Sequence, residues 1–471
     1  MAVVFRILAP FSIALLTPAS ATLAQDALSS SEFTKCADSG SHPSLEDTEC
    51  ARVQAPLDHT DGIAGTIELF VRKFPAEGNP EGQLWLVAGG PGESGASFYP
   101  FMHSLRAAAP GFDVLVPDHR GTGFSTRLCP REEDPSGEAG SALAGEEWGT
   151  CFSALIAEAG RTKAFTISNA AHDLDLLITR FDTGGPTFLY GVSYGTQLAL
   201  RMLTLEAQDD LDGVILDSLV PLESNGDLDL SHRSAVTDSV GRTVLRKCDK
   251  RPDCRRYFRA GAEQALRRIF ERDDVDELAG ANLRYKLAAL LDFPETRVML
   301  PDVIAGLQAG DPAWLEYAMG RLASIGASLQ QYPQSGSSIP LVSLISRSEN
   351  NARPTLTAEM VESEEENNLF ASPLPSLLLS GGIPTYEPDA SFGKSPEKLP
   401  RTIVLHGTLD PKTPYHGAEE HVAALETAGD IKLIPVEQAP HFILMTAPEA
   451  FATAVGAFLE GDSVTPESGK R

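Results

Sequence analysis

A serine between two glycines is the first candidate for chemistry in this sequence. Ser193 lies in the pentapeptide GVSYG, which runs from Gly191 to Gly195. The apolar run PTFLY before it predicts a buried strand, and TQLALRMLTLEAQ after it predicts a helix, because its apolar residues recur at helical spacing without glycine or proline. A GxSxG turn between a strand and a helix exposes the serine hydroxyl as a nucleophile. Glycine and serine also form ordinary turns, so the pentapeptide alone leaves both interpretations open.

Candidate partners for this serine follow two later strands. Asp410 comes directly after TIVLHG, and His441 follows IKLIPVE. Serine, acid and histidine in this order match the triad of α/β hydrolases. In such a triad the imidazole takes the serine proton, while the carboxylate fixes the imidazole tautomer and stabilises its cation. We therefore predict Ser193 as nucleophile, Asp410 as acid and His441 as base.

Other acids and histidines compete for these roles. Asp217 also ends an apolar run, GVILD, but it precedes the long helical part of the chain and lacks an equally open loop. Three further histidines lie near predicted strands, at His119, His406 and His416. Only His441 follows the final predicted strand with an acid upstream, and a lone histidine is more often structural than catalytic.

A glycine-rich loop after the predicted strand QLWLVA offers backbone donors. Its sequence is GGPGESG, and glycines allow the backbone to approach a reacting group closely. We predict that the amides of Gly90 and Tyr194 form an oxyanion hole beside Ser193. The alternative is a tight turn that requires positive φ angles.

The elements that position these residues alternate between strands and helices. The predicted strands are TIELFVRKF, QLWLVAGG, FDVLVPD, PTFLYG, GVILD, TIVLHG and IKLIPVE. Several are continuous apolar runs, as expected for a sheet covered on both faces by helices. The sequence therefore predicts an α/β fold with a mostly parallel central sheet, in which functional groups gather beyond the carboxyl ends of the strands.

One long stretch departs from this alternation. Helical periodicity dominates residues 226–395, which predicts an inserted helical cap. The core is then divided into residues 44–225 and residues 396–460, and the second part carries the acid and the histidine. The acidic end, residues 461–471, is predicted to be a frayed tail.

The N-terminus predicts export. Residues 1–24 contain one basic residue, an apolar stretch too short to span a bilayer and then small residues, as in a secretory signal cleaved after Ala21 or Ala24. The alternative is an uncleaved anchor or a buried helix. No later segment is apolar enough to cross a membrane, so we expect a secreted or periplasmic protein without stable membrane insertion after signal removal.

Six cysteines support disulfide formation in an exported protein. Pairing of nearest neighbours is one of 15 connectivities and is our hypothesis. It joins Cys36 with Cys50, Cys129 with Cys151, and Cys248 with Cys254. None of them has metal-ligand spacing with histidines, so we expect no metal site.

Charge narrows the range of partners. The formal net charge is -27, with 65 acidic and 38 basic residues, which opposes binding to nucleic acid or to anionic lipid surfaces. The oligomeric state is left open.

The motifs GGPGESG, PDHRGTGFS, GVSYG, HGTLDPKTPYHGA and APHF together resemble the proline iminopeptidase and tripeptidyl aminopeptidase family of serine peptidases. The resemblance runs from about residue 44 to residue 460, and CDKRPDC favours the secreted tripeptidyl aminopeptidase branch. It implies an α/β-hydrolase fold, the roles given above for Ser193, Asp410 and His441, and a cap that closes over the peptide's amino end. It implies no metal or organic cofactor.

Recognition of a free amine requires a carboxylate held away from bulk water. The cap segment MVESEEENNLF supplies candidates, and comparison with the family's cap motif favours Glu365. The alternative is a solvated acidic face.

We therefore expect an exported serine exopeptidase that releases one or a few residues from the amino ends of peptides through an acyl-enzyme. A carboxylesterase or lipase-like hydrolase on the same triad is the first alternative, and a non-catalytic hydrolase-fold binding protein is the second.

Overall fold

The structure is a computed structural model that describes residues 32–134, 143, 145–205, 211–379 and 382–465. The predicted signal segment, residues 1–24, lies outside the described residues, as do residues 466–471 of the predicted tail.

Among the described residues, nine strands form one mixed sheet at the centre of the α/β part, in the order β1-β2-β3-β5-β4-β6-β7-β8-β9. The strands are β1 (Thr34–Lys35), β2 (Glu49–Pro56), β3 (Thr66–Phe74), β4 (Gly82–Val87), β5 (Phe112–Asp118), β6 (Thr187–Val192), β7 (Gly213–Asp217), β8 (Thr402–Gly407) and β9 (Ile431–Val436). The pairs β1–β2, β2–β3 and β3–β5 are antiparallel, and all later pairs are parallel. The carboxyl ends of β4, β6, β7, β8 and β9 therefore meet at one edge.

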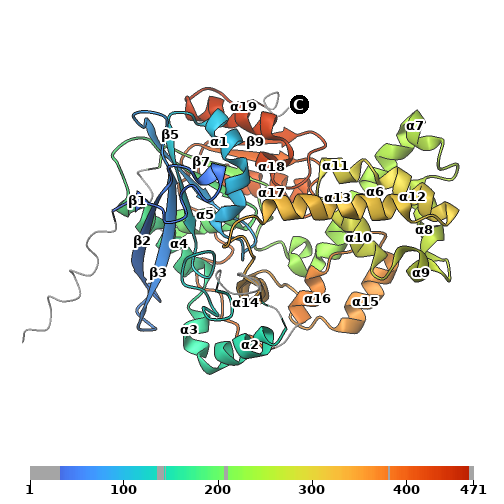
Figure 1. Cartoon of the computed structure of the whole chain (residues 1–471), viewed down its shortest axis with the longest axis horizontal. Coiled ribbons are helices and arrows are strands. Elements are labelled where there is room, and N and C mark those ends of the chain that lie inside the picture. Colours follow the sequence, from blue (N-terminus) through green and yellow to red (C-terminus); the bar gives the residue numbers. More distant parts are fainter. Residues whose placement is uncertain (1–31, 135–142, 144, 206–210, 380–381, 466–471) are drawn as a thin grey trace, which may run out of the picture.

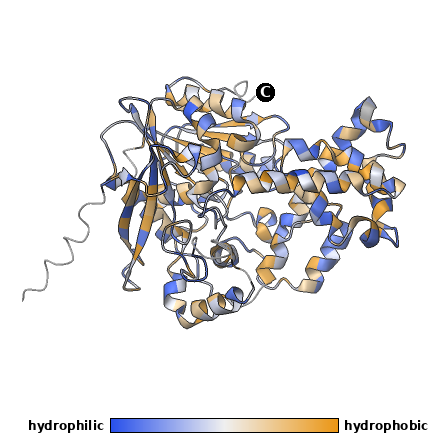
Figure 2. Cartoon of the chain, in the orientation of Figure 1, coloured by the Kyte–Doolittle hydropathy of each residue, from blue (hydrophilic) through white to orange (hydrophobic). Residues whose placement is uncertain are grey.

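Helices cover both faces of this sheet. They are α1 (Met102–Ala108), α4 (Ile167–Arg180), α5 (Tyr194–Leu205), α17 (Tyr415–Leu425), α18 (Ile443–Thr446) and α19 (Pro448–Leu459). Buried side chains of α4, α5 and α17 belong to one apolar cluster, and those of α1 and α19 belong to another. Strand residues belong to both clusters, so the sheet lies between the two helix layers. Figure 2 colours the strands and helices by hydropathy.

The predicted strands and the predicted α/β-hydrolase fold are confirmed, but β1 and β2 were not predicted. The sequence of β2, ECARVQAP, alternates inward-facing Ala51, Val53 and Ala55 with exposed neighbours. Its inward residues are small and its last residue is proline, so it lacks the long apolar run that marked the other strands.

Between β7 and β8 the described chain consists of helices and loops, and most of these helices form a lobe beside the sheet (Figure 1). The helices are η4 (Gly226–Leu228), η5 (Leu230–His232), α6 (Arg233–Lys250), α7 (Pro252–Arg255), α8 (Ala262–Phe270), α9 (Val275–Ala279), α10 (Leu283–Ala289), α11 (Pro294–Arg297), α12 (Leu300–Ala309), α13 (Ala313–Leu329), α14 (Ile339–Glu349), α15 (Ala358–Asn367) and α16 (Leu374–Leu379). The lobe has its own apolar cluster, built largely from α6, α8, α10, α12 and α13.

Helix α14 differs from its neighbours in the sequence. Its buried residues Leu341, Leu344 and Ile345 join the cluster that contains α4 and α5, and not the cluster of the lobe. This helix therefore brings its C-terminal residue, Glu349, to the core helix α5.

The remaining short elements are η2 (Pro43–Leu45), η3 (Gly95–Phe101), α2 (Glu147–Ala157) and α3 (Ala159–Lys163). The three disulfides join Cys36 to Cys50, Cys129 to Cys151 and Cys248 to Cys254, so the nearest-neighbour pairing is confirmed. Within the described part of the chain, no helix is long and apolar enough to cross a membrane.

Candidate active site

Ser193 occupies a sharp turn between β6 and α5. Its φ of 54° lies in the left-handed region, which a residue other than glycine rarely adopts. Its backbone N–H donates to the carbonyl oxygen of Asp217 at 3.0 Å, and its own carbonyl accepts the N–H of Thr196 at 2.8 Å. Neighbouring backbone on both sides thus holds the serine at the carboxyl edge of the sheet.

The two glycines of the pentapeptide are required by close backbone approach. A Cβ atom on Gly191 would lie 2.4 Å from the carbonyl oxygen of Gly195. A Cβ atom on Gly195 would lie 2.3 Å from the carbonyl oxygen of Val87, at the end of β4. Any side chain at either position would therefore force the turn away from the sheet.

Asp410 and His441 meet at the ends of β8 and β9. Nδ1 of His441 lies 2.7 Å from Oδ2 of Asp410, and both side chains are buried. The backbone N–H groups of Lys412 and Thr413 donate to Oδ1 of Asp410 at 2.8 and 2.9 Å. Burial opposes ionisation of Asp410, but the charge and hydrogen bond of His441 outweigh it and hold the pKa of this carboxyl well below its ordinary value.

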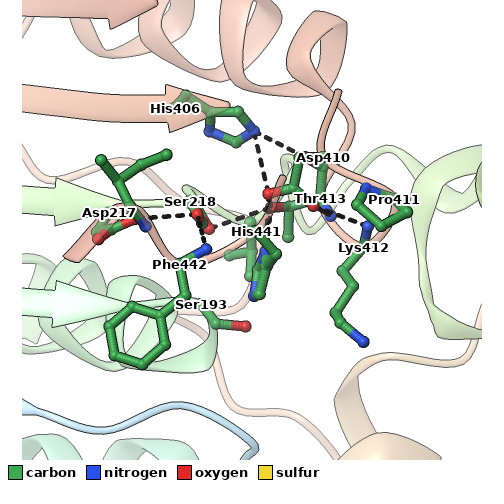
Figure 3. A network of polar contacts seen from close by, with 12 residues as sticks. Ser193, Asp217, Ser218, His406, Asp410, Pro411, Lys412, Thr413, His441 and Phe442 are labelled. Atoms are coloured by element: carbon green, nitrogen blue, oxygen red, sulfur yellow. Dashed lines mark hydrogen bonds and ion pairs between the residues drawn. The ribbon is translucent and has the colours of Figure 1, made fainter. Parts of the chain in front are cut away.

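Thr413 and His406 complete the surroundings of this carboxylate. The Thr413 hydroxyl lies 2.9 Å from Oδ2 of Asp410 and 3.3 Å from Nδ1 of His441. His406 lies across the acid from His441 (Figure 3), and its Nε2 is 2.7 Å from the carbonyl oxygen of Thr413. Burial lowers the pKa of His406, so this ring is neutral and fixes the acid loop through a hydrogen bond.

Asp217, the competing acid, contacts the backbone after His441. Its carboxylate accepts the N–H groups of Ile443 at 2.8 Å and Leu444 at 3.0 Å. The neighbouring Ser218 hydroxyl accepts the N–H of Phe442 at 2.8 Å (Figure 3). Asp217 therefore positions the segment that carries His441, and Asp410 is the carboxylate at the imidazole.

The backbone amides of Gly90 and Tyr194 are the predicted oxyanion donors, and this role stays a prediction. Both residues line the same cavity as Ser193. Gly90 has a φ of 113°, which explains the glycine at this position. Tyr194 is the first residue of α5, so its N–H is among those with no partner inside the helix.

The cavity above Ser193 and His441 has a volume of about 840 Å³ and lies between the sheet edge and the helical lobe. Its lining includes carboxylates that were not predicted: Glu93, Glu223, Asp229, Asp292 and Glu349. Two cations, Arg233 and Lys412, also line it.

Two of these carboxylates share one guanidinium. Nη2 of Arg201 lies 2.7 Å from Glu223 and 2.8 Å from Glu349. The two glutamates line the cavity, whereas Arg201 lies behind them on α5. Burial raises the pKa of Glu349, although Arg201 opposes this effect. When both glutamates are ionised, they exceed the single Arg201 by one negative charge.

The pair of Glu223 and Glu349 was not predicted from the sequence, because the two residues are far apart in the chain. Glu223 lies in the loop after β7, and Glu349 ends α14. Only the packing of α14 against the core brings them together, and neither residue lies in a recognisable local motif.

Glu365, the residue predicted to hold a substrate amine, lies away from Ser193. It is on α15 and lines a separate cavity with Tyr285, whose hydroxyl donates to both of its carboxylate oxygens at 2.9 and 2.8 Å. Glu365 does not line the cavity at Ser193, so the structure does not bring Glu365 together with the serine.

Two family models match the chain. A model described as the alpha/beta hydrolase fold matches residues 84–259, which include Ser193. A model described as a TAP-like protein matches residues 376–470, which include Asp410 and His441. No curated protein matches the chain in sequence.

Several solved structures match most of the length of this chain at low sequence identity. They include a thermophilic esterase from Thermogutta terrifontis, with 17% identity, a TM-score of 0.37 and coverage of 87% of this chain and 98% of that one. A hydrolase from Pseudomonas aeruginosa has 15% identity and a TM-score of 0.39, with 86% and 98% covered. A laboratory-evolved potato epoxide hydrolase has 16% identity and a TM-score of 0.40, with 88% and 100% covered.

With similarity this low, the substrates of those proteins say nothing about this one. The strand order and the two matching family models identify the protein as an α/β hydrolase.

Proposed function

We propose that this α/β hydrolase is an exported serine exopeptidase that releases one or a few residues from the amino ends of peptides. Ser193, Asp410 and His441 are its catalytic residues, and the amides of Gly90 and Tyr194 form its oxyanion hole. The match of residues 376–470 to a TAP-like model and the three disulfides support this proposal.

The reaction proceeds in two steps. Oγ of Ser193 attacks the peptide carbonyl while its proton passes to Nε2 of His441, and the carbonyl oxygen becomes an oxyanion held by the two backbone amides. The C–N bond then breaks, His441 returns the proton to the leaving nitrogen, and an acyl-enzyme remains. Water, deprotonated by His441, attacks this ester, and Ser193 regains its proton as the acyl product leaves.

The observation that carries the exopeptidase proposal is the acidic wall formed by Glu223 and Glu349. A peptide's free amino end is a cation at neutral pH, and two partly desolvated carboxylates that share one guanidinium attract it. An ester substrate without an amine gains nothing from this wall. Gln197, one turn after Ser193, donates to Glu223 at 2.8 Å, which ties the acidic wall to the helix of the nucleophile.

The test is hydrolysis of Pro-linked and Ala-Ala-Pro-linked fluorogenic substrates, each with a free and with an acetylated amine, beside a simple acyl ester. We expect turnover of free-amine substrates alone, and its loss in Ser193→Ala. Turnover of the ester alone would make the protein an esterase, and no turnover of any substrate would favour a binding protein.

A further inference from the structure

Arg233, the first residue of α6, lines the active-site cavity, and no ion pair joins it to an acid in the described part of the chain. Only 8% of the residue is exposed, and its Nε atom is buried without a hydrogen bond. No ion pair or hydrogen bond joins its guanidinium to any residue that the structure describes. A buried cation without a partner is costly, and proteins normally pair such groups.

The three acids whose charges act on Arg233 are already engaged with other groups. Asp410 binds His441, and Asp292 pairs with Lys412 at 3.0 Å. Asp229 accepts the backbone N–H of Ser231 at 2.9 Å. Burial lowers the pKa of Arg233 to about 10, although these three acids oppose the effect, so the guanidinium stays charged at neutral pH.

The position of α6 relates this charge to the reaction. Thr237, one turn after Arg233, donates to the carbonyl oxygen of Pro411 at 3.1 Å, so the start of α6 lies over the loop that carries Asp410. The N-terminus of this long helix adds partial positive charge at the same place. The acidic wall of Glu223 and Glu349 instead belongs to the side of α5, which follows the serine.

We propose that Arg233 binds a carboxylate on the leaving part of the substrate, so that the enzyme acts on short peptides whose free carboxyl end lies within the cavity. This inference rests on the proposed exopeptidase function. The histidine hands its proton to the leaving nitrogen, so the leaving fragment lies on the side of the histidine and its acid, where Arg233 is. The acidic wall then holds the amino end of a short zwitterionic peptide, and Arg233 holds its carboxyl end, with Ser193 between them.

The test compares peptides that differ in one group. Pro-Ala and Ala-Ala-Pro-Ala are each prepared as the free acid and as the carboxamide, and kcat and KM for release of the last residue are measured by mass spectrometry. We expect kcat/KM for the free acids to exceed that for the amides by about tenfold or more, the effect of one charge-assisted hydrogen-bonded pair. Amides with aspartate as the last residue distinguish an end carboxylate from a side-chain carboxylate, and we expect them to remain poor substrates.

Variants of Arg233 test whether this residue causes the preference for free acids over carboxamides. Arg233→Gln should bring the acid-to-amide ratio close to one, and Arg233→Lys should retain part of it. Arg246→Gln is the matched control, because Arg246 lies on the same helix with an exposed side chain and should leave the ratio unchanged.

Equal constants for acids and amides in the wild type would overturn this inference and leave the exopeptidase function standing, whether or not the variants fold. If amides that end in aspartate were cleaved as well as the free acids, Arg233 would not be specific for the carboxyl group at the peptide's end. Failure to cleave any of these peptides would contradict both proposals.

Discussion

The carboxylate of Asp217 accepts the backbone N–H of Ile443 at 2.8 Å, two residues after the histidine of the site. A buried acid at the end of β7 thus fixes the loop that follows β9. Asp217→Ala removes the acceptor of two buried N–H groups, so we expect the free energy of unfolding to fall by about 2–4 kcal/mol. The Tm of thermal unfolding and the turnover rate should fall together. Undiminished stability would contradict this positioning role.

Asp410→Asn should affect chemistry more than stability. The asparagine side chain leaves His441 in the wrong tautomer, so we expect kcat to fall by about 10⁴-fold with little change in KM. Circular dichroism and steady-state kinetics on the same preparation measure the two effects. A fall of only a few-fold would show that another group supports the histidine.

Glu223→Gln and Glu349→Gln should each raise KM for free-amine peptides by about tenfold, because each removes one charge from the acidic wall. Hydrolysis of a simple ester should change little. Glu365→Gln is the control, since Glu365 lines a different cavity. Equal losses on peptides and esters, or a larger effect of Glu365→Gln, would argue against the wall as an amine site.

Glu93 gives a prediction about pH. Burial raises the pKa of this cavity-lining glutamate above 4.5, although the charges of His441 and Lys412 oppose the shift. A raised folded-state pKa means that ionisation of Glu93 opposes folding at neutral pH, whereas below pH 4.5 the group is protonated in both states and this cost disappears. Glu93→Gln should therefore raise Tm at pH 7 and lose this advantage on acidification. A gain that is independent of pH would have another cause.

The disulfide between Cys129 and Cys151 joins two residues that are 22 positions apart in the sequence. In the chain-entropy account, a loop of this length contributes about 3 kcal/mol to stability. Replacing both cysteines with serine should lower the midpoint of denaturant unfolding accordingly. An unchanged midpoint would show that the packing around the buried sulfurs, and not the covalent link, stabilises this region.

The sequence predicted the parts of the site that depend on local order. Ser193, Asp410 and His441 each follow a strand with a strong apolar run, so the parallel sheet brings them to one edge. The roles themselves remain predictions until activity is measured.

The sequence did not predict what depends on packing between distant segments. Glu349 reaches the cavity because the apolar face of α14 packs on the core, although its neighbours in the sequence belong to the lobe. In the sequence Arg233 is one of many basic residues, and only the structure shows that its buried Nε has no hydrogen bond among the described residues. The family resemblance favoured Glu365, but the position of α15 separates that residue from the serine.

The most direct measurement is intact-protein mass spectrometry after treatment with a fluorophosphonate, followed by peptide mapping. We expect one adduct on Ser193, no adduct in Ser193→Ala, and much slower labelling in His441→Ala, because the histidine activates the serine. A wild type that resists labelling, or an adduct on another residue, would contradict Ser193 as the nucleophile.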